Sequence, residues 1–414
     1  MTIAALPASP IQHRIESIDV LRGVAVLGIL LLNVRTFALP SAAYSSPTIA
    51  GVQTDLDMTV FLAVQLLCDA KFMTIFSILF GAGVMIFTSR VEARLGGSGV
   101  LHYRRMGWLL LIGLCHAWLL WWGDILVAYA LCGMLVFPLR KLLPRWQAII
   151  GLGLLVVGAT LPWLIWQLVQ LGGPESIAEF SEALATTPES IQSERAAWGG
   201  GWLDQWDLRT SLAMMLETSV FAVWVFWRTL GLMLIGMACL QWRAFDPWRS
   251  LRVPVGMVVL GLLVGLPLVW QGILANQGES WSSIGVLFSN AYWNYWGSVP
   301  TAFAWIGMVM LLCRISLLAP IRSLLAAVGR MALTNYLAQS LLCGVVFYGW
   351  GMGRYEQFGY AQQLIVVAGI WALQLMWSPI WLGRFQFGPV EWLWRTLTYW
   401  KLQPFRRERV HLES

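Results

Sequence analysis

The amino-acid sequence predicts an all-α, polytopic integral membrane protein, with one transmembrane domain over residues 1–414. Three observations support this prediction. Hydrophobic residues make up 58% of the chain and charged residues only 12%, with a mean hydropathy of +0.68. Several apolar runs reach the ~20 residues that a helix needs to cross a bilayer. The 26 tryptophans suit the boundary between acyl chains and headgroups, where amphipathic indoles are enriched.

Apolar runs of about 17 to 25 residues predict about ten transmembrane helices. The segment between the fifth and sixth of them, residues 171–216, is expected to be an outer loop: its seven carboxylates favour a solvated connection, with a lid over the outer surface as the alternative. Residues 387–401 mix tryptophan with arginine and lysine, which predicts a helix lying in the inner interface. In chain order, the ten helices are expected at residues 18–39, 57–88 (long or broken), 105–122, 124–139, 146–170, 217–240, 253–274, 297–318, 324–349 and 361–382.

Basic residues are distributed unequally between the two sides of this predicted topology. Twenty lie on the side that holds both termini, whereas only Arg195, Arg209 and Arg354 lie on the other side. Because cytoplasmic loops of membrane proteins carry an excess of Lys and Arg, both termini are predicted to be cytoplasmic. Insertion topology therefore explains the net charge of +6, and no nucleic-acid partner is expected.

Bound metals and tightly bound cofactors are not expected. The six cysteines are dispersed through apolar segments without CxxC spacing, so they indicate neither a disulfide framework nor a zinc site. The sequence has no metal-ligand cluster and no Gly-rich phosphate loop.

Polar side chains within the predicted spans need partners or water, because the bilayer core provides neither. In the first helix, Asp19 and Arg22 are spaced i, i+3, and Asn33 falls in the same sector. An Asp19–Arg22 pair that anchors the helix end is the structural alternative to a functional role. Lys71 is expected deep in the second helix, unless that helix is broken.

The ninth helix contributes two amides, Asn335 and Gln339, spaced i, i+4 near mid-membrane. They are expected either to bond across helices or, together with Lys71, to line a polar passage that binds substrate. Both interpretations remain open from the sequence.

The stretch GLCHAWLLWWGDILVAYALCG, residues 113–133, carries His116 and Asp124 in apolar surroundings, separated by a tryptophan pair and Gly123. Asp124 is expected to cap the fourth helix. A direct His116–Asp124 hydrogen bond requires the intervening turn to dip inward, and that alternative stays open. Tyr129 is expected level with His116. The remaining histidines, His13, His102 and His411, fall in segments predicted to be cytoplasmic.

Five blocks of this sequence together resemble, in order, the YeiB-like family of bacterial inner-membrane proteins. The resemblance covers nearly the whole chain and implies a multi-pass protein of the bacterial inner membrane. The blocks are residues 18–44, 71–83, 113–133, 329–340 and 388–399.

The D-x-x-R-G block, formed by Asp19, Arg22 and Gly23, also resembles the start of transmembrane acyltransferases, a group that includes the lysosomal heparan glucosaminide acetyltransferase. Those enzymes move an acyl group from cytosolic acyl-CoA to an acceptor on the far side, with an essential membrane-embedded histidine. His116 lies in the third helix, whereas the catalytic histidine of the lysosomal enzyme follows the helix that carries the block.

The resemblance implies acyl transfer from acyl-CoA to a hydroxyl or amine acceptor. His116 is then the expected general base, with Tyr129 or Asn33 orienting the imidazole or donating to the developing oxyanion. Membrane lipids are expected partners, and self-association is left open. The alternatives are a secondary transporter of a small solute or lipid-linked intermediate, and a non-catalytic scaffold. The cations expected for the CoA phosphates are Arg22, Arg104 and Arg105.

Overall fold

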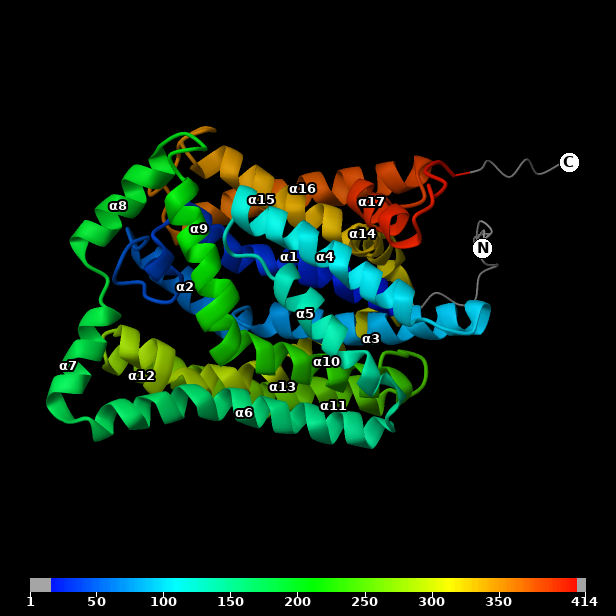
Figure 1. Cartoon of the computed structure of the whole chain (residues 1–414), viewed down its shortest axis with the longest axis horizontal. Coiled ribbons are helices and arrows are strands. Elements are labelled where there is room, and N and C mark those ends of the chain that lie inside the picture. Colours follow the sequence, from blue (N-terminus) through cyan, green and yellow to red (C-terminus); the bar gives the residue numbers. More distant parts are fainter. Residues whose placement is uncertain (1–15, 408–414) are drawn as a thin grey trace, which may run out of the picture.

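The computed structural model describes residues 16–407, and within them the fold is entirely helical (Figure 1). No strand occurs in this range, where the only extended pairing is an isolated bridge between Phe385 and Arg406. Four residues named in the topology and histidine predictions, His13, Arg14, Arg409 and His411, lie outside the described range.

Seven helical segments in residues 16–407 are long and apolar enough to cross a membrane. The number is eight if a bent pair of helices, Ser316–Arg330 and Ala332–Phe347, counts as one span. Each of the ten expected segments contains a helix, so the polytopic all-α prediction is confirmed. The main helices are α1 (Glu16–Ala38), α2 (Asp55–Leu67), α3 (Lys71–Leu95), α4 (Gly99–Leu119), α5 (Leu126–Val136), α6 (Pro144–Leu171), α7 (Gly173–Ala183), α8 (Pro188–Gly199), α9 (Trp206–Met215), α10 (Phe226–Gln241), α11 (Arg252–Leu260), α12 (Leu266–Gly278), α13 (Ala291–Leu312), α14 (Ala319–Arg330), α15 (Ala332–Phe347), α16 (Tyr360–Arg384) and α17 (Pro389–Tyr399).

Three expected helices differ from simple spans. The second is broken at residues 68–70, where Ala70 adopts a left-handed conformation between α2 and α3. The fourth shortens to the 11-residue α5, since Pro138 follows its end. The ninth, expected as one helix over 324–349, bends by 81° at Met331, so that α14 and α15 run in different directions.

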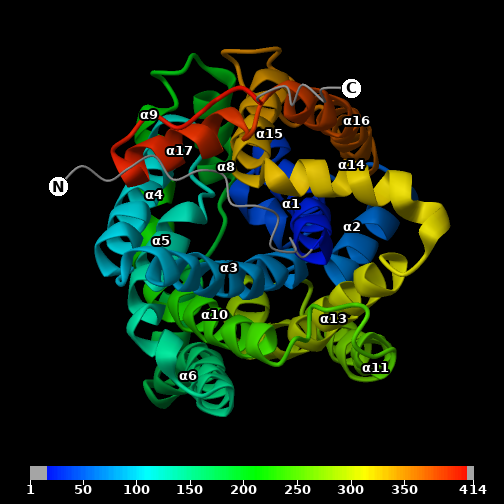
Figure 2. The same cartoon turned by 90° about the vertical axis from the view of Figure 1, so that its right-hand side faces the viewer.

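The first helix lies at the centre of the bundle, surrounded by the others, when the molecule is viewed along its long axis (Figure 2). Its contact with α14 depends on two glycines. A Cβ at Gly23 would overlap the carbonyl of Leu325, and one at Gly329 would overlap the carbonyl of Asp19. Close backbone approach of this kind is the usual reason for small residues at helix contacts in membranes.

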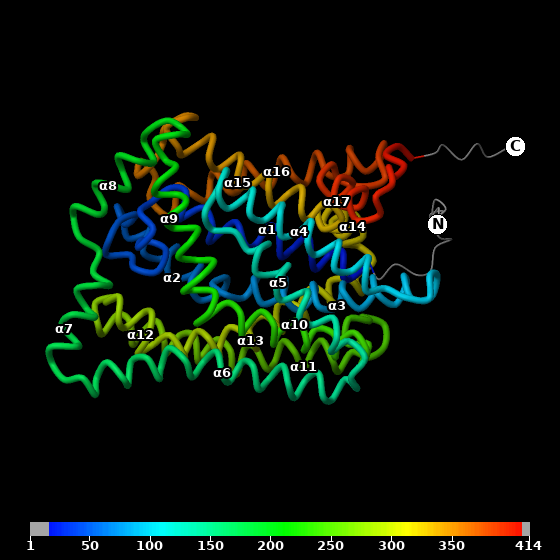
Figure 3. The backbone as a smooth tube through the Cα atoms, viewed as in Figure 1, coloured from blue at the N-terminus to red at the C-terminus, as the bar shows by residue number. Residues whose placement is uncertain are grey.

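The bundle has two ends along its long axis (Figure 3). We call the one that holds the starts of α1 and α4, the ends of α3 and α16, and helices α14 and α17 the basic end; the opposite one, which holds α7 and α8, is the far end. From the distribution of basic residues in the sequence, the basic end is expected to face the cytoplasm.

Residues 171–216, expected as an outer loop, form α7, α8 and α9, and the chain continues from α9 into α10 through a π-helical segment. These helices dock on the far end. Glu194 accepts hydrogen bonds from the Ser41 amide at 2.8 Å and the Ser41 hydroxyl at 2.7 Å, and the Trp198 and Tyr348 rings stack at 4.6 Å. Within this segment α8 therefore packs on the far end through Glu194 and Trp198, whereas α7 has no buried residue.

Candidate functional site

The site begins with the turn of residues 120–125 between α4 and α5. It dips into the bundle: the Trp121 side chain is buried and stacks on Phe37 with ring centroids 4.7 Å apart. Gly123 is required here because a Cβ at this position would overlap the Trp121 indole. This folded turn carries Asp124 toward the last turn of α4, where His116 lies.

His116 is held by a hydrogen bond at each ring nitrogen. Its Nδ1 lies 2.7 Å from Asp124 Oδ1, and its Nε2 lies 2.9 Å from the hydroxyl of Ser340 in α15. The second Asp124 oxygen, Oδ2, accepts from the amide of Val127 at 2.8 Å. Asp124 therefore both contacts His116 and caps the start of α5, so the two alternatives left open by the sequence are both realised. We call Asp124, His116 and Ser340 the His116 array.

The hydrogen bonds of the array favour one tautomer of the His116 imidazole. A carboxylate only accepts, so Nδ1 carries the proton that it shares with Asp124. Nε2 then presents its lone pair to the Ser340 hydroxyl. All three side chains are buried, with exposures of 5% or less. This is the arrangement of nucleophile, base and orienting acid that activates a hydroxyl.

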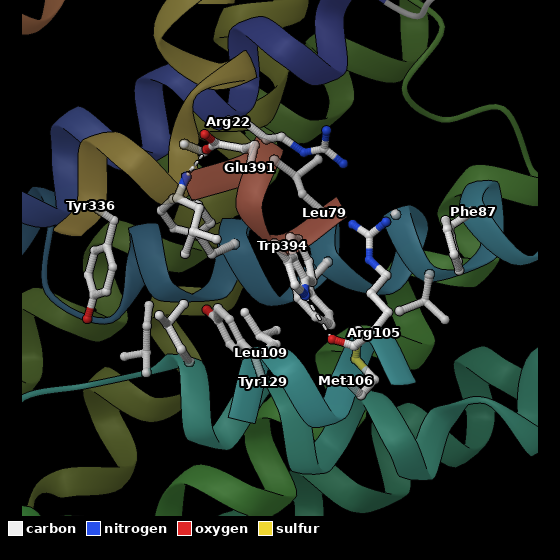
Figure 4. Close-up of a pocket in the computed structure, with 18 of the residues that line it drawn as sticks. Arg22, Leu79, Phe87, Arg105, Met106, Leu109, Tyr129, Tyr336, Glu391 and Trp394 are labelled. Atoms are coloured by element: carbon white, nitrogen blue, oxygen red, sulfur yellow. Dashed lines mark hydrogen bonds between the residues drawn. The ribbon is translucent and has the colours of Figure 1, made fainter. Parts of the chain in front are cut away.

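A cavity of about 220 Å³ reaches Tyr336, whose ring neighbours His116; the three residues of the His116 array are not in its lining. Figure 4 shows Arg22 and Arg105 at one end of it and Tyr336 at the other. The Tyr336 ring lines the cavity and also lies against the imidazole of His116, with centroids 5.1 Å apart. Tyr336 thus separates the cavity from His116.

The cavity combines cations at one end with apolar walls. Arg105 stacks on Trp394 at 4.0 Å and on Phe87 at 4.5 Å, and Figure 4 shows its guanidinium on the same side of the cavity as that of Arg22. Cations beside an apolar space suit an anionic headgroup joined to an acyl chain. The apolar lining includes Phe76, Leu79, Phe80, Val84, Met106, Leu109, Ile125, Leu126 and Leu333, and Arg330 is the third arginine of the lining.

Glu391 of α17 fixes one wall of the cavity. It accepts from the amides of Leu333 at 2.7 Å and Thr334 at 3.0 Å, which are free donors in the first turn of α15. Burial raises the pKa of Glu391, and the hydrogen bonds from Thr334 oppose that shift. Residues 387–401 were expected to form an inner interfacial helix; α17 lies at the basic end and anchors the start of α15.

Three residues predicted to act at the site, Arg104, Tyr129 and Asn33, have other contacts. Arg104 is not in the cavity lining, and its guanidinium lies 3.9 Å from the centroid of the Trp400 ring. Tyr129 lines the cavity, but its hydroxyl donates to the Met73 carbonyl at 3.2 Å. The backbone carbonyl of Asn33 accepts a hydrogen bond from the Thr36 hydroxyl at 2.8 Å. Asp124 and Ser340 hold the imidazole instead of Tyr129 or Asn33. Asp19 pairs with Arg22 at 3.6 Å, as the anchoring alternative proposed.

Lys71, Asn335 and Gln339 bond across helices and are not among the cavity lining. The Lys71 ammonium donates to the Gln65 carbonyl at 3.0 Å and to the Asn294 amide oxygen at 2.9 Å. Asn335 donates to Ser378 at 3.1 Å, and Gln339 donates to the Val26 carbonyl at 3.0 Å and to Gln374 at 2.9 Å. These contacts favour the structural interpretation of all three residues.

Sequence reasoning missed Ser340, Trp121, Arg330 and Arg228. A serine at the end of GRMALTNYLAQS gives no signal by itself, because its pairing with His116 spans 224 positions. Arg228 had a signal, as a cation inside a predicted span. It is buried and bonds to the Tyr295 carbonyl, Thr74 and Ser298 at 2.7–2.8 Å.

Comparisons with known proteins give the relatives of this chain. The family model described as a protein of unknown function, DUF418, matches residues 239–401. The uncharacterized protein YeiB of Escherichia coli (strain K12) is 32% identical over 396 residues, which cover 94% of this chain and 97% of YeiB. The uncharacterized protein YxaH of Bacillus subtilis (strain 168) is 27% identical, with 98% and 99% covered.

Proposed function

We propose that this chain, which belongs to the YeiB-like family of membrane proteins, is a transmembrane acyltransferase that takes an acyl group from cytosolic acyl-CoA and passes it to a hydroxyl or amine acceptor at the far side. The observation that carries the proposal is His116, held between Asp124 and Ser340 beside a cavity with arginines at its opening.

His116 supplies the base that acyl transfer needs. An unactivated hydroxyl or amine is a weak nucleophile until a base removes its proton. With Nδ1 engaged by Asp124, the lone pair of Nε2 is directed at a hydroxyl 2.9 Å away. A base of this kind contributes about 10²–10⁴ in rate.

The cavity suits the donor. Acyl-CoA joins phosphates to an acyl thioester, so it needs cations at one end of its site and apolar walls at the other. Arg22, Arg105 and Arg330 provide the cations near the basic end, and the apolar lining leads to Tyr336 beside His116. A donor bound with its phosphates at the arginines directs its thioester toward the array.

The transporter alternative relied on a polar passage through the membrane. Lys71, Asn335 and Gln339, which were to line it, direct their donors at protein carbonyls and amides. Intramembrane groups paired in this way act as connections between helices. Acyl transfer therefore has the stronger support of the two.

Thiol release tests the proposal. The full chain is reconstituted in lipid vesicles with acetyl-CoA or palmitoyl-CoA as donor and hydroxylamine as a small nucleophilic acceptor. We expect free CoA thiol and an acyl hydroxamate to form, and His116→Ala to slow both by ~10²–10⁴. Equal rates for the two proteins, at matched thermal stability, contradict the proposal.

A further inference from the structure

We infer that Ser340 is the acyl carrier of this protein: it attacks the donor thioester, holds the acyl group as an ester and then passes it to the acceptor. This inference rests on the proposed function for the identity of the donor. It goes beyond that function because a base alone requires no covalent intermediate and no serine. The juxtaposition that supports it is Ser340, His116 and Asp124 in one hydrogen-bonded series.

Ser340 occupies the position that a nucleophile takes in such a series, with its hydroxyl against the basic nitrogen of the histidine. Its hydroxyl lies 2.9 Å from Nε2, the nitrogen that Asp124 leaves unprotonated. If His116 acted only on an external acceptor, that acceptor would have to displace Ser340 from the lone pair. The same order of serine, histidine and acid recurs on unrelated folds, where it is recognised by geometry and not by sequence position.

Trp121 provides a donor for the charge that develops in this reaction. Its Nε1 is buried and has no hydrogen-bond partner within residues 16–407, although leaving a buried donor unpaired is unfavourable. The Trp121 ring centroid lies 5.9 Å from that of His116. An indole N–H kept unpaired beside the array suits an oxyanion, which needs donors that are already in place.

Tyr336 controls the approach to Ser340. It precedes Ser340 by four residues in α15, so the two side chains share one face of that helix. Its ring forms the end of the cavity and lies on His116. A thioester in the cavity meets Tyr336 first, and reaches Ser340 once that ring turns aside.

The chemistry balances without an additional reactant. Ser340 Oγ attacks the thioester carbonyl carbon while its proton passes to His116 Nε2. The carbon–sulfur bond then breaks, and the CoA sulfur leaves as the thiol with that proton. The acceptor next attacks the Ser340 ester and gives its proton to Nε2. Ser340 leaves as the hydroxyl, regaining a proton from Nε2, and the acyl group is bonded to the acceptor.

The direct test is capture of the ester. The purified full chain is mixed with palmitoyl-CoA in the absence of acceptor, quenched in acid and analysed by peptide mass spectrometry. We expect one palmitoyl group on Ser340, none in Ser340→Ala, and formation at least ~10²-fold slower in His116→Ala. Ser340→Cys is expected to form a hydroxylamine-labile thioester. Trp121→Phe, which keeps the stacking on Phe37, is expected to slow acylation by ~10², whereas the adjacent Trp122→Phe leaves it within a few-fold.

A serine-reactive alkyl fluorophosphonate separates failure of this inference from failure of the proposed function, since it labels an activated serine without CoA. Labelling of Ser340 that requires His116, without acylation by acyl-CoA, supports the carrier and overturns the proposed donor. Acyl transfer that requires His116 but persists in Ser340→Ala overturns the carrier and retains the proposed function. Absence of both labelling and acylation at Ser340 overturns the carrier.

Discussion

Asp124 determines which nitrogen of His116 is basic, and a single atom change tests this role. In Asp124→Asn the amide oxygen still accepts from the Val127 amide, so the cap of α5 is retained. The new NH₂ then faces Nδ1 and donates to it, which leaves the proton on Nε2 and removes the lone pair directed at Ser340.

We therefore expect Asp124→Asn to lower thiol release by ~10³–10⁴ while the melting temperature changes little. Asp124→Ala is the comparison, because it loses the cap as well and is expected to lower stability by ~1 kcal/mol. Wild-type turnover in Asp124→Asn would show that the carboxylate serves only as a cap.

Arg104 and Arg105 are neighbours in the sequence but have different surroundings. Substituting each of them in turn therefore gives a matched test of donor binding. The Arg105 guanidinium lines the cavity between Phe87 and Trp394, whereas Arg104 lies over Trp400 outside it. We expect Arg105→Ala to raise the KM for acyl-CoA about tenfold or more and Arg104→Ala to leave it within twofold, in steady-state assays of thiol release. Equal effects would indicate a general role of positive charge at the basic end.

Among the elements, α17 connects the cavity to α15 through Glu391. Its buried carboxyl has a raised pKa, so the folded protein retains this proton at a pH where the unfolded chain, with an ordinary pKa of about 4.5, has lost it. The stabilising contribution of protonated Glu391 is therefore complete below the pKa of the unfolded chain. It is lost as the pH rises through the higher pKa of the folded protein. In Glu391→Gln this dependence is absent.

We expect the stability difference between wild type and Glu391→Gln to change in favour of the variant as pH rises above about 4.5. Thermal melts of both proteins between pH 4 and 7 measure this. Parallel melting curves across that range contradict the assignment of a raised pKa to Glu391.

The sequence predicted most helices because apolar length is a local property. It did not predict the 81° bend at Met331, because residues 324–349 read as one apolar run without proline. The bend arises from tertiary contacts: α14 crosses against α1 through Gly23 and Gly329, and Glu391 of α17 caps the new start at Ala332. These partners lie far away in the sequence, and no local pattern reports them.

In the candidate site, too, the residues that stand out locally were predicted and those that depend on distant contacts were not. His116 and Asp124 were recognised from the sequence because ionisable groups are conspicuous in an apolar stretch. Ser340 was not recognised, since a serine in a span usually bonds to its own helix or a neighbour. Likewise, Arg104 and Arg105 are adjacent and indistinguishable in the sequence, and their contacts with Trp400 and Trp394 distinguish them in the structure.

The two ends of the whole molecule differ in charge and in what covers them. Three arginines line the cavity near the basic end, which is expected to face the cytoplasm, while α8 packs on the far end. Under the proposed function, a cytosolic donor would bind at the end of the molecule that is expected to face the cytoplasm.

The most direct measurement is thiol release from acyl-CoA supplied to one side at a time of vesicles in which the orientation of the chain has been sorted. We predict release when the donor meets the basic end and little when it meets the far end, with the active orientation silenced by His116→Ala. Release from the far end, or release that His116→Ala leaves unchanged, would contradict the account.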